Sequence, residues 1–346
     1  MAWVRVAGAT AGSCRTISSH KAHSRAARAA PRGVTAASQR AGGEGGAPWG
    51  TRRLRGAPPA PRAPTALRAS RTPRPLQPFE LERFFAKYEF CTRHLLCCSD
   101  CEPLTLKELL GIADEDSLER WESLSLGYTE APGLPALREE AAAMYESVSA
   151  DEVMCAAPEE LIYLFMLALL EPGDHVVVTS PGYQSLYEIA QSLGCEVRFW
   201  EPATNDAGEL EFQVQGGPGS LEEVVTGGPP PKLVVTNFPH NPTGKTLTAA
   251  QWEAVVAMCD VHGAHLFSDE MYRLLEHSPE ARLPSAVDVY PRAVALSGVS
   301  KTIGLPGLRT GWLATHDAAL LSRVAELKDY TTICGSAPSE VLALMG

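Results

Sequence analysis

One lysine of the sequence lies in a setting that suits covalent chemistry. Lys301 follows the apolar run AVALS and precedes the glycine-rich stretch GLPGLR, which places it just beyond a buried strand. A lysine amine forms a Schiff base with an aldehyde only when it is deprotonated, and burial in a site with other cationic groups lowers its pKa. We therefore predict that Lys301 is a nucleophilic amine with a lowered pKa and not a surface lysine.

Two further polar clusters follow apolar runs in the same way. Asn241 lies in NFPHNPTG after KLVVTN, and Asp269 and Tyr272 lie in SDEMY after AHLFS. In open sheets of parallel strands, ligands bind beyond the carboxyl ends of the strands. We expect the three clusters, including the one around Lys301, to converge on one edge of such a sheet.

The elements that would position these clusters alternate regularly. Short apolar runs predict strands at 175–179, 195–200, 232–237, 264–268 and 293–297. Between them, helices are predicted at 158–171, 185–194 and 248–263, and Thr248 with Gln251 forms a capping box for the last. This pattern predicts an α/β fold with a mostly parallel central sheet in a three-layer α/β/α arrangement.

The remaining segments complete the expected organisation. Helices are predicted in LERFFAKYEF and LTLKELLGI and from Pro135 through PALREEAAAMYESV, while the Gly- and Pro-rich stretch 216–231 is predicted to be a loop. The apolar run 161–170 is shorter than the roughly 20 residues that a bilayer requires, so it is predicted to be a buried helix.

Charge is distributed unevenly along the 346 residues. The formal net charge is −11, yet residues 1–75 hold 14 Lys and Arg and one acidic residue, Glu44. An acidic remainder disfavours nucleic acid or an anionic membrane as a partner. The basic first segment, without a long apolar run, is typical of an organelle transit peptide, plastid or mitochondrial, with a disordered tail or an incorrectly assigned start as the alternatives.

The nine cysteines do not suggest a disulfide framework, because their number is odd and they are scattered. Cys98 and Cys101 form a C-x-x-C, but a zinc site needs a second ligand pair, and none is evident. We expect reduced, structural cysteines and no metal.

The ordered set NPTG, SDE-x-Y and SK-x-x-GLPGLR-x-GW resembles the fold-type I pyridoxal-phosphate enzymes, and among them the class I and II aminotransferases, over about residues 79–346. The resemblance implies pyridoxal 5'-phosphate as cofactor and transfer of an amino group between an amino acid and a 2-oxo acid. It also implies four regions: a transit-like segment at 1–75, an N-terminal arm with part of a small domain at 76–125, the large cofactor-binding domain at 126–325, and the beginning of a further small-domain segment at 326–346.

The resemblance assigns roles around the cofactor ring. Lys301 is the Schiff-base position and, once freed by a substrate amine, the general base for the substrate α-proton. Asp269 matches the carboxylate that faces the pyridine nitrogen and keeps it protonated. Asn241 and Tyr272 match the pair that hydrogen-bonds the phenolic oxygen, and the Asn241–Pro242 peptide bond is expected to depart from trans geometry.

Other roles concern the phosphate. Arg309 matches the arginine that grips it with paired N–H donors. Ala157, Pro158 and Glu159 occupy the family's phosphate-binding turn at a helix start, where backbone N–H groups meet the anion. Pro158 departs from this pattern, because it has no N–H to donate.

Further matches lie beside the lysine and farther away. Gly298 stands where the family often has a phosphate-binding serine, although Ser300 is adjacent to Lys301. Tyr183 matches the aromatic residue that stacks on the cofactor ring. Tyr128 resembles a tyrosine that reaches the partner subunit's site, which implies a homodimer.

Family members usually continue for about another hundred residues, an ordinary size for a second small domain. The arginine that binds the substrate carboxylate lies in that part, so the resemblance assigns none in this chain. Two alternatives therefore stand beside amino transfer. One is elimination, decarboxylation or cyclisation of an amino acid with the same cofactor, as in capreomycidine synthase, which LCCSDCEPLTLKELL faintly resembles. The other is a non-catalytic protein that binds the cofactor.

Overall fold

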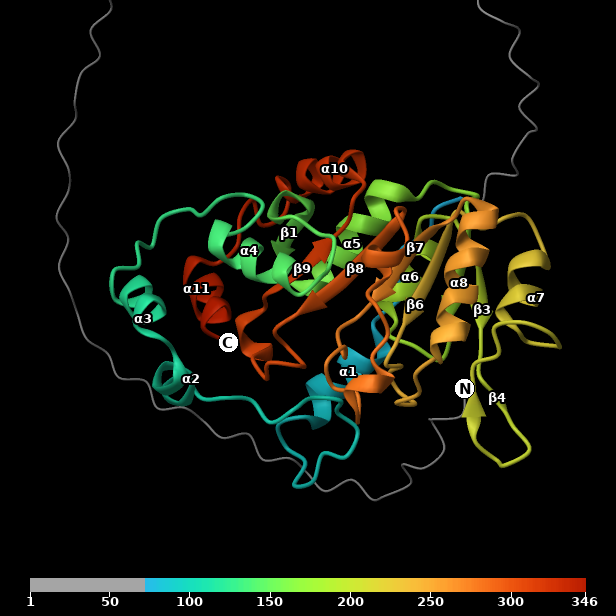
Figure 1. Ribbon diagram of the computed structural model, residues 1–346, viewed down its shortest axis with the longest axis horizontal. Coiled ribbons are helices and arrows are strands. Elements are labelled where there is room, and N and C mark those ends of the chain that lie inside the picture. The colour runs from blue at the N-terminus through green and yellow to red at the C-terminus, as the bar shows by residue number, and fades with distance from the viewer. Residues whose placement is uncertain (1–71) are drawn as a thin grey trace, which may run out of the picture. The chain divides into compact units, whose positions relative to one another are not determined.

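The computed structural model describes residues 72–346, all of which belong to one compact unit (Figure 1). The predicted transit-like segment lies outside this range apart from its last four residues. Among these, Arg74 Nη1 donates to Glu188 Oε1 over 2.6 Å. The part of the chain with defined contacts therefore begins before residue 76.

A seven-stranded sheet forms the centre of the unit, in the order β1-β9-β8-β7-β6-β2-β3. The strands are β1 (Val153–Ala156), β9 (Gly311–Ala314), β8 (Ala293–Gly298), β7 (His265–Asp269), β6 (Leu233–Asn237), β2 (His175–Thr179) and β3 (Glu196–Trp200). From β8 to β3 all pairs are parallel, whereas β9 runs antiparallel to both β8 and β1. The mostly parallel sheet is confirmed, and β1 and β9 are additions to it.

Helices cover both faces of the sheet (Figure 1). One face carries α5 (Pro158–Leu169), α6 (Ser185–Ser192) and α10 (Ala318–Lys328), and the other carries α4 (Pro135–Ala143), α7 (Leu221–Thr226), α8 (Ala249–His262) and α9 (Ala286–Val289). Along β2, Val177 belongs to the core that includes Val255 of α8, whereas Val176 and Val178 belong to the core that includes Phe165 of α5. A strand buried on both faces must be apolar throughout, which is why HVVVT predicts it.

The other elements lie around this body. They are α1 (Glu80–Tyr88), α2 (Leu106–Ile112), α3 (Glu115–Glu122), α11 (Ala337–Met345), the two-stranded ribbon of β4 (Ala203–Thr204) and β5 (Leu210–Glu211), and the 3₁₀ turns η1 (Ala150–Glu152), η2 (Pro279–Ala281) and η3 (Pro306–Leu308). The capping box of Thr248 and Gln251 is present at the start of α8. Among residues 72–346 no helix is long and apolar enough to cross a bilayer.

Two sequence expectations differ from the structure. The stretch 216–231 is not a continuous loop, because it contains α7. Ser220 Oγ accepts a hydrogen bond from Glu223 N over 3.2 Å, and Leu221 and Val225 are buried. A cap and two buried side chains therefore stabilise a short helix between glycines. The helix from Pro135 ends at Ala143, several residues earlier than predicted.

The buried side chain of Phe165 joins α5 to the sheet, and its removal tests this packing. Phe165 is fully buried, and its ring centroid lies 4.6 Å from that of Phe267 on β7. We expect Phe165→Ala to lower the free energy of unfolding by about 3–5 kcal/mol, because it leaves a cavity beneath the helix. Tyr163→Ala, on the same helix but 39% exposed, is the control and should cost less. Urea denaturation measures both, and equal losses would contradict this account of the core.

Candidate active site at the carboxyl ends of the parallel strands

A cavity of about 290 Å³ lies where β6, β7 and β8 end. Eight of the ten predicted site residues line it: Lys301, Asp269, Tyr272, Asn241, Arg309, Tyr183, Glu159 and Ser300. They come from the strand ends, from the start of α5 and from the loop before α6. The convergence expected from the strand-end rule is therefore present.

The remaining two predicted residues lie elsewhere. Ala157 precedes α5 and lines a neighbouring cavity, which Arg309 also borders. Tyr128 is 91% exposed and does not line the cavity of its own chain. Its role at the site of a partner subunit stays a prediction.

Asp269 is a buried carboxyl group at the end of β7. Its Oδ1 accepts a hydrogen bond from Met271 N over 3.1 Å, and its backbone carbonyl accepts one from Asn237 Nδ2 over 3.0 Å. Burial raises the pKa of Asp269 to about 7, although the Met271 N–H opposes the shift. A nearby cation would stabilise the ionised form of this buried carboxyl group.

Tyr272 and Asn241 meet across the cavity. Asn241 Nδ2 donates to Tyr272 Oη over 3.3 Å, and Ser99 Oγ lies 2.7 Å from the same oxygen. The Asn241–Pro242 peptide bond is cis, which confirms the departure from trans that the resemblance implied. Asn237 Oδ1 accepts from Asn241 N over 2.9 Å, so the end of β6 holds this turn in place.

Lys301 corrects one expectation. Its amine forms an ion pair with Asp100, a residue of the N-terminal arm. Burial lowers the pKa of Lys301, but the hydrogen bond with Asp100 and the neighbouring Tyr272 outweigh burial, and the pKa lies above its usual value. The predicted lowering of the Lys301 pKa is wrong for this structure, because the nearest charged group is a carboxylate and not a cation.

The other end of the cavity has features that suit an anion. Ser300 is buried, and its Oγ has no hydrogen-bond partner in the structure. Arg309 has a left-handed backbone with φ 56° and donates through Nη1 to Pro306 O over 2.9 Å. Burial raises the pKa of Glu159 to about 7, so that it can lie near an anion in its neutral form.

The structure explains why a glycine stands at position 298. A Cβ added to Gly298 would lie 2.8 Å from Gly311 Cα and 3.0 Å from Thr310 O, because β8 and β9 approach closely there. A serine at this position would therefore clash with backbone. The buried hydroxyl at this end of the cavity belongs to Ser300 instead.

These residues fit pyridoxal 5'-phosphate. Asp269 is a buried carboxyl group that a pyridinium N–H would satisfy, and the unpartnered Ser300 Oγ would donate to a phosphate oxygen. Arg309 supplies a cation at the same end. The cavity thus has a carboxylate for the ring nitrogen and separate donors for the phosphate.

Several lining residues escaped the sequence analysis. The N-terminal arm contributes Glu82, Cys97, Cys98, Ser99 and Asp100 to the cavity wall. The sequence predicts no site role for any residue of LCCSDCE, and its cysteines were expected to be structural. In fact Cys97 and Cys98 are exposed to solvent at the cavity.

Comparison with known proteins agrees with this geometry. Residues 120–345 match the family described as aminotransferase class I and II, and the chain belongs to that family. It is 31% identical over 210 residues to an arginine–pyruvate transaminase of Pseudomonas aeruginosa, covering 58% of this chain and 50% of that protein. It is 30% identical over 235 residues to a valine–pyruvate aminotransferase of Mycobacterium tuberculosis, covering 63% and 55%. The chain therefore spans about half the length of these relatives.

Solved structures show the same fold. A PLP-dependent aminotransferase from Streptococcus suis matches with a TM-score of 0.68 and 29% identity, over 78% of this chain and 70% of that one. A PLP-dependent cyclase matches with a TM-score of 0.68 and 28% identity, over 79% and 69%. The fold is thus shared by proteins whose reactions differ.

The raised pKa of Asp269 should make the stability of the cofactor-free protein depend on pH. This group ionises near 4 in the unfolded chain and near 7 in the folded one, so its contribution to stability falls as the pH rises through that window. Asp269→Asn removes this dependence. We expect the thermal midpoint of the variant, relative to the wild type, to rise between about pH 4 and pH 7.

Thermal unfolding across this range measures the effect, with Asp260→Asn on the exposed side of α8 as the control. Parallel pH profiles for the wild type and Asp269→Asn would show that the carboxyl group is not buried as described.

Proposed function

We propose that this chain binds pyridoxal 5'-phosphate through Lys301 and transfers an amino group from an amino acid to a 2-oxo acid. The observation that carries the proposal is the convergence of Lys301, Asp269, Tyr272, Asn241 and Arg309 on one cavity. Membership of the aminotransferase family supports it. The bound cofactor would supply an aldehyde and a ring that accepts electrons.

The chain's residues have distinct tasks in this proposal. Asp269 would keep the ring nitrogen protonated, and Arg309 with Ser300 would hold the phosphate. Lys301 would supply the amine for the covalent link and, when free, the base for the proton at the substrate α-carbon. Tyr272 would donate to the phenolic oxygen.

A homodimer is part of the proposal. Tyr128 is almost fully exposed, as is the apolar side chain of Leu126 close by in the chain. Burial of such side chains against a second copy would stabilise an assembly. A partner's Tyr128 would then be available to the cofactor site.

A second candidate keeps the cofactor and changes the reaction to elimination, decarboxylation or cyclisation of an amino acid. Two similarities favour it: the cyclase structure and a capreomycidine synthase of Streptomyces vinaceus, 30% identical over 178 residues. The two reactions differ in their need for a 2-oxo acid. A non-catalytic protein that binds the cofactor is the third candidate.

We expect the purified full chain with bound cofactor to lose its visible absorbance when mixed with a suitable amino acid and to regain it with a 2-oxo acid. Lys301→Ala should lower this rate by at least ~100-fold, because general base catalysis is lost. Lys107→Ala, at an exposed position, is the control.

Release of ammonia or carbon dioxide without a 2-oxo acid would favour the second candidate. Full activity of Lys301→Ala would contradict both reactions.

We also propose that residues 1–75 direct the chain to an organelle, because they hold 14 basic residues and one acidic residue. A fluorescent protein fused behind these residues should collect in plastids or mitochondria. A fusion in which the Arg residues of the segment are replaced by Gln should stay diffuse. Diffuse fluorescence of the unchanged fusion would contradict the proposal.

A further inference from the structure

Two adjacent residues of the N-terminal arm hold two groups that the proposed function assigns to the cofactor. Asp100 Oδ1 contacts Lys301 Nζ, and Ser99 Oγ lies 2.7 Å from Tyr272 Oη. The Lys301 amine is the atom that would bond to the aldehyde carbon, and the Tyr272 hydroxyl would donate to the phenolic oxygen beside it. The Lys301 amine is not free for its task while its contact with Asp100 persists.

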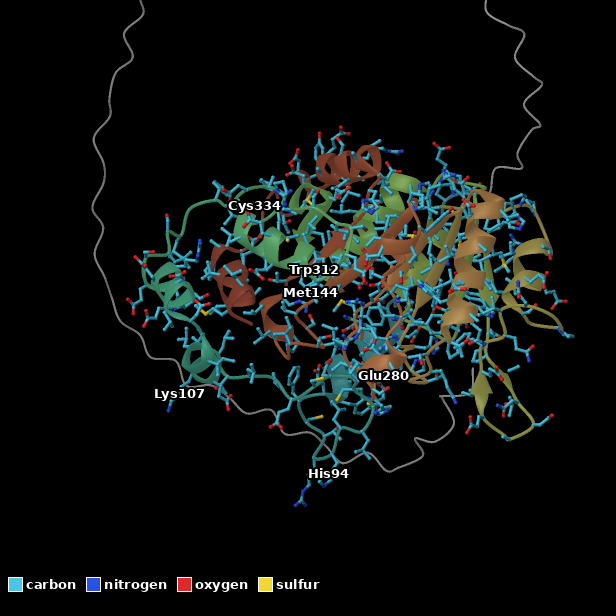
Figure 2. All side chains as sticks on the ribbon, viewed as in Figure 1. His94, Lys107, Met144, Glu280, Trp312 and Cys334 are labelled. Atoms are coloured by element: carbon cyan, nitrogen blue, oxygen red, sulfur yellow. The ribbon has the colours of Figure 1, made fainter. Side chains whose placement is uncertain are left out.

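The segment that carries Ser99 and Asp100 has little else to hold it over the cavity. All residues from 90 to 100 except Leu95 are exposed, and Phe90 and Leu96 are more than 90% exposed. Figure 2 shows His94 at the outer end of this segment, away from the sheet. A segment with few buried contacts opens at low cost in free energy.

The segment is anchored on both sides of this exposed stretch. Before it, Tyr183 Oη donates to Glu82 Oε1 of α1 over 3.0 Å. After it, Leu104 N donates to Gly304 O over 3.1 Å. The chain between these anchors can move while the rest of the arm stays in place.

The groups that face the Lys301 amine come from three places. Asp100 comes from the arm, Tyr272 follows β7 with its ring centroid 5.9 Å from Nζ, and Asp269 lies at the end of β7. Asp100 makes the direct contact, and Asp269 is buried and partly neutral near pH 7. The charge beside Lys301 therefore depends mainly on Asp100.

We propose that Asp100 is a positioning residue that holds the Lys301 amine as an ammonium while the cofactor is absent. The contact between Asp100 and Lys301 is a latch that must release Lys301 before the cofactor can bind covalently. The proposal rests on the proposed function.

Release requires the Lys301 ammonium to give one proton to the Asp100 carboxylate, which passes it to solvent. The free amine would then be available to the aldehyde of a bound cofactor. The bond would form between Nζ and the aldehyde carbon, and the aldehyde oxygen would leave as water with the two remaining amine hydrogens.

The first test needs no cofactor. The cofactor-free full chain is treated with formaldehyde and cyanoborohydride between about pH 7 and pH 11, and methylation of Lys301 is followed by peptide mass spectrometry. Removing a contacting carboxylate typically lowers a lysine pKa by ~1 unit or more, so Asp100→Asn should move the labelling midpoint of Lys301 down by that amount. Lys107, which points into solvent in Figure 2, is the internal control and should not change.

Three further variants test whether the shift of the Lys301 labelling midpoint depends on the Asp100 carboxylate itself. Glu102→Gln removes an equal charge two residues away and outside the cavity wall, and Ser99→Ala removes only the hydroxyl. Both should leave the Lys301 midpoint in place. Asp100→Glu keeps the carboxylate and should restore most of the wild-type midpoint. A midpoint that is unchanged in Asp100→Asn, or shifted equally in Glu102→Gln, would overturn the proposal.

The second test follows loading of pyridoxal 5'-phosphate by its visible absorbance at neutral pH. A one-unit fall in the pKa of the amine gives ~10-fold more free base, so Asp100→Asn should load ~10-fold faster than the wild type. Equal rates would overturn the latch. If no variant binds the cofactor, the proposed function fails, while the methylation experiment still decides whether Asp100 holds Lys301.

Discussion

The ends of three neighbouring parallel strands determine the chemistry of this molecule. β6, β7 and β8 run in the same direction, so the residues that follow them meet at one edge of the sheet. Asn237 joins two of these ends, since its amide accepts from Asn241 N and donates to Asp269 O. Burial at this edge raises the pKa of Asp269, and the same cavity contains the unpartnered Ser300 hydroxyl. A cofactor with a basic ring nitrogen and a phosphate meets both requirements.

Much of the fold could be predicted from the sequence, because strands buried on both faces are apolar throughout and stand out between amphipathic helices. The strands β1 and β9 were missed, since each has only four residues and lies beside glycine- or proline-rich segments that indicate turns. The helix α7 was missed for a similar reason, because glycines on both sides concealed its cap at Ser220.

The site divides into a part that could be predicted and a part that could not. Asp269 is the last residue of β7, and Asn241 and Lys301 lie a few residues beyond β6 and β8. Their convergence could therefore be predicted from the local sequence. Asp100 lies 201 residues from Lys301 along the chain, in an exposed segment without periodicity, and only the folded arrangement shows their contact. The direction of the Lys301 pKa shift was predicted incorrectly for the same reason, because it depends on that distant carboxylate.

Chemical trapping most directly tests the proposed covalent bond between Lys301 and pyridoxal 5'-phosphate. The full chain is saturated with the cofactor and reduced with borohydride, and its peptides are mapped by mass spectrometry. We predict a single phosphopyridoxyl group on the peptide that contains Lys301. A label on another lysine, or no stable label at all, would contradict the account.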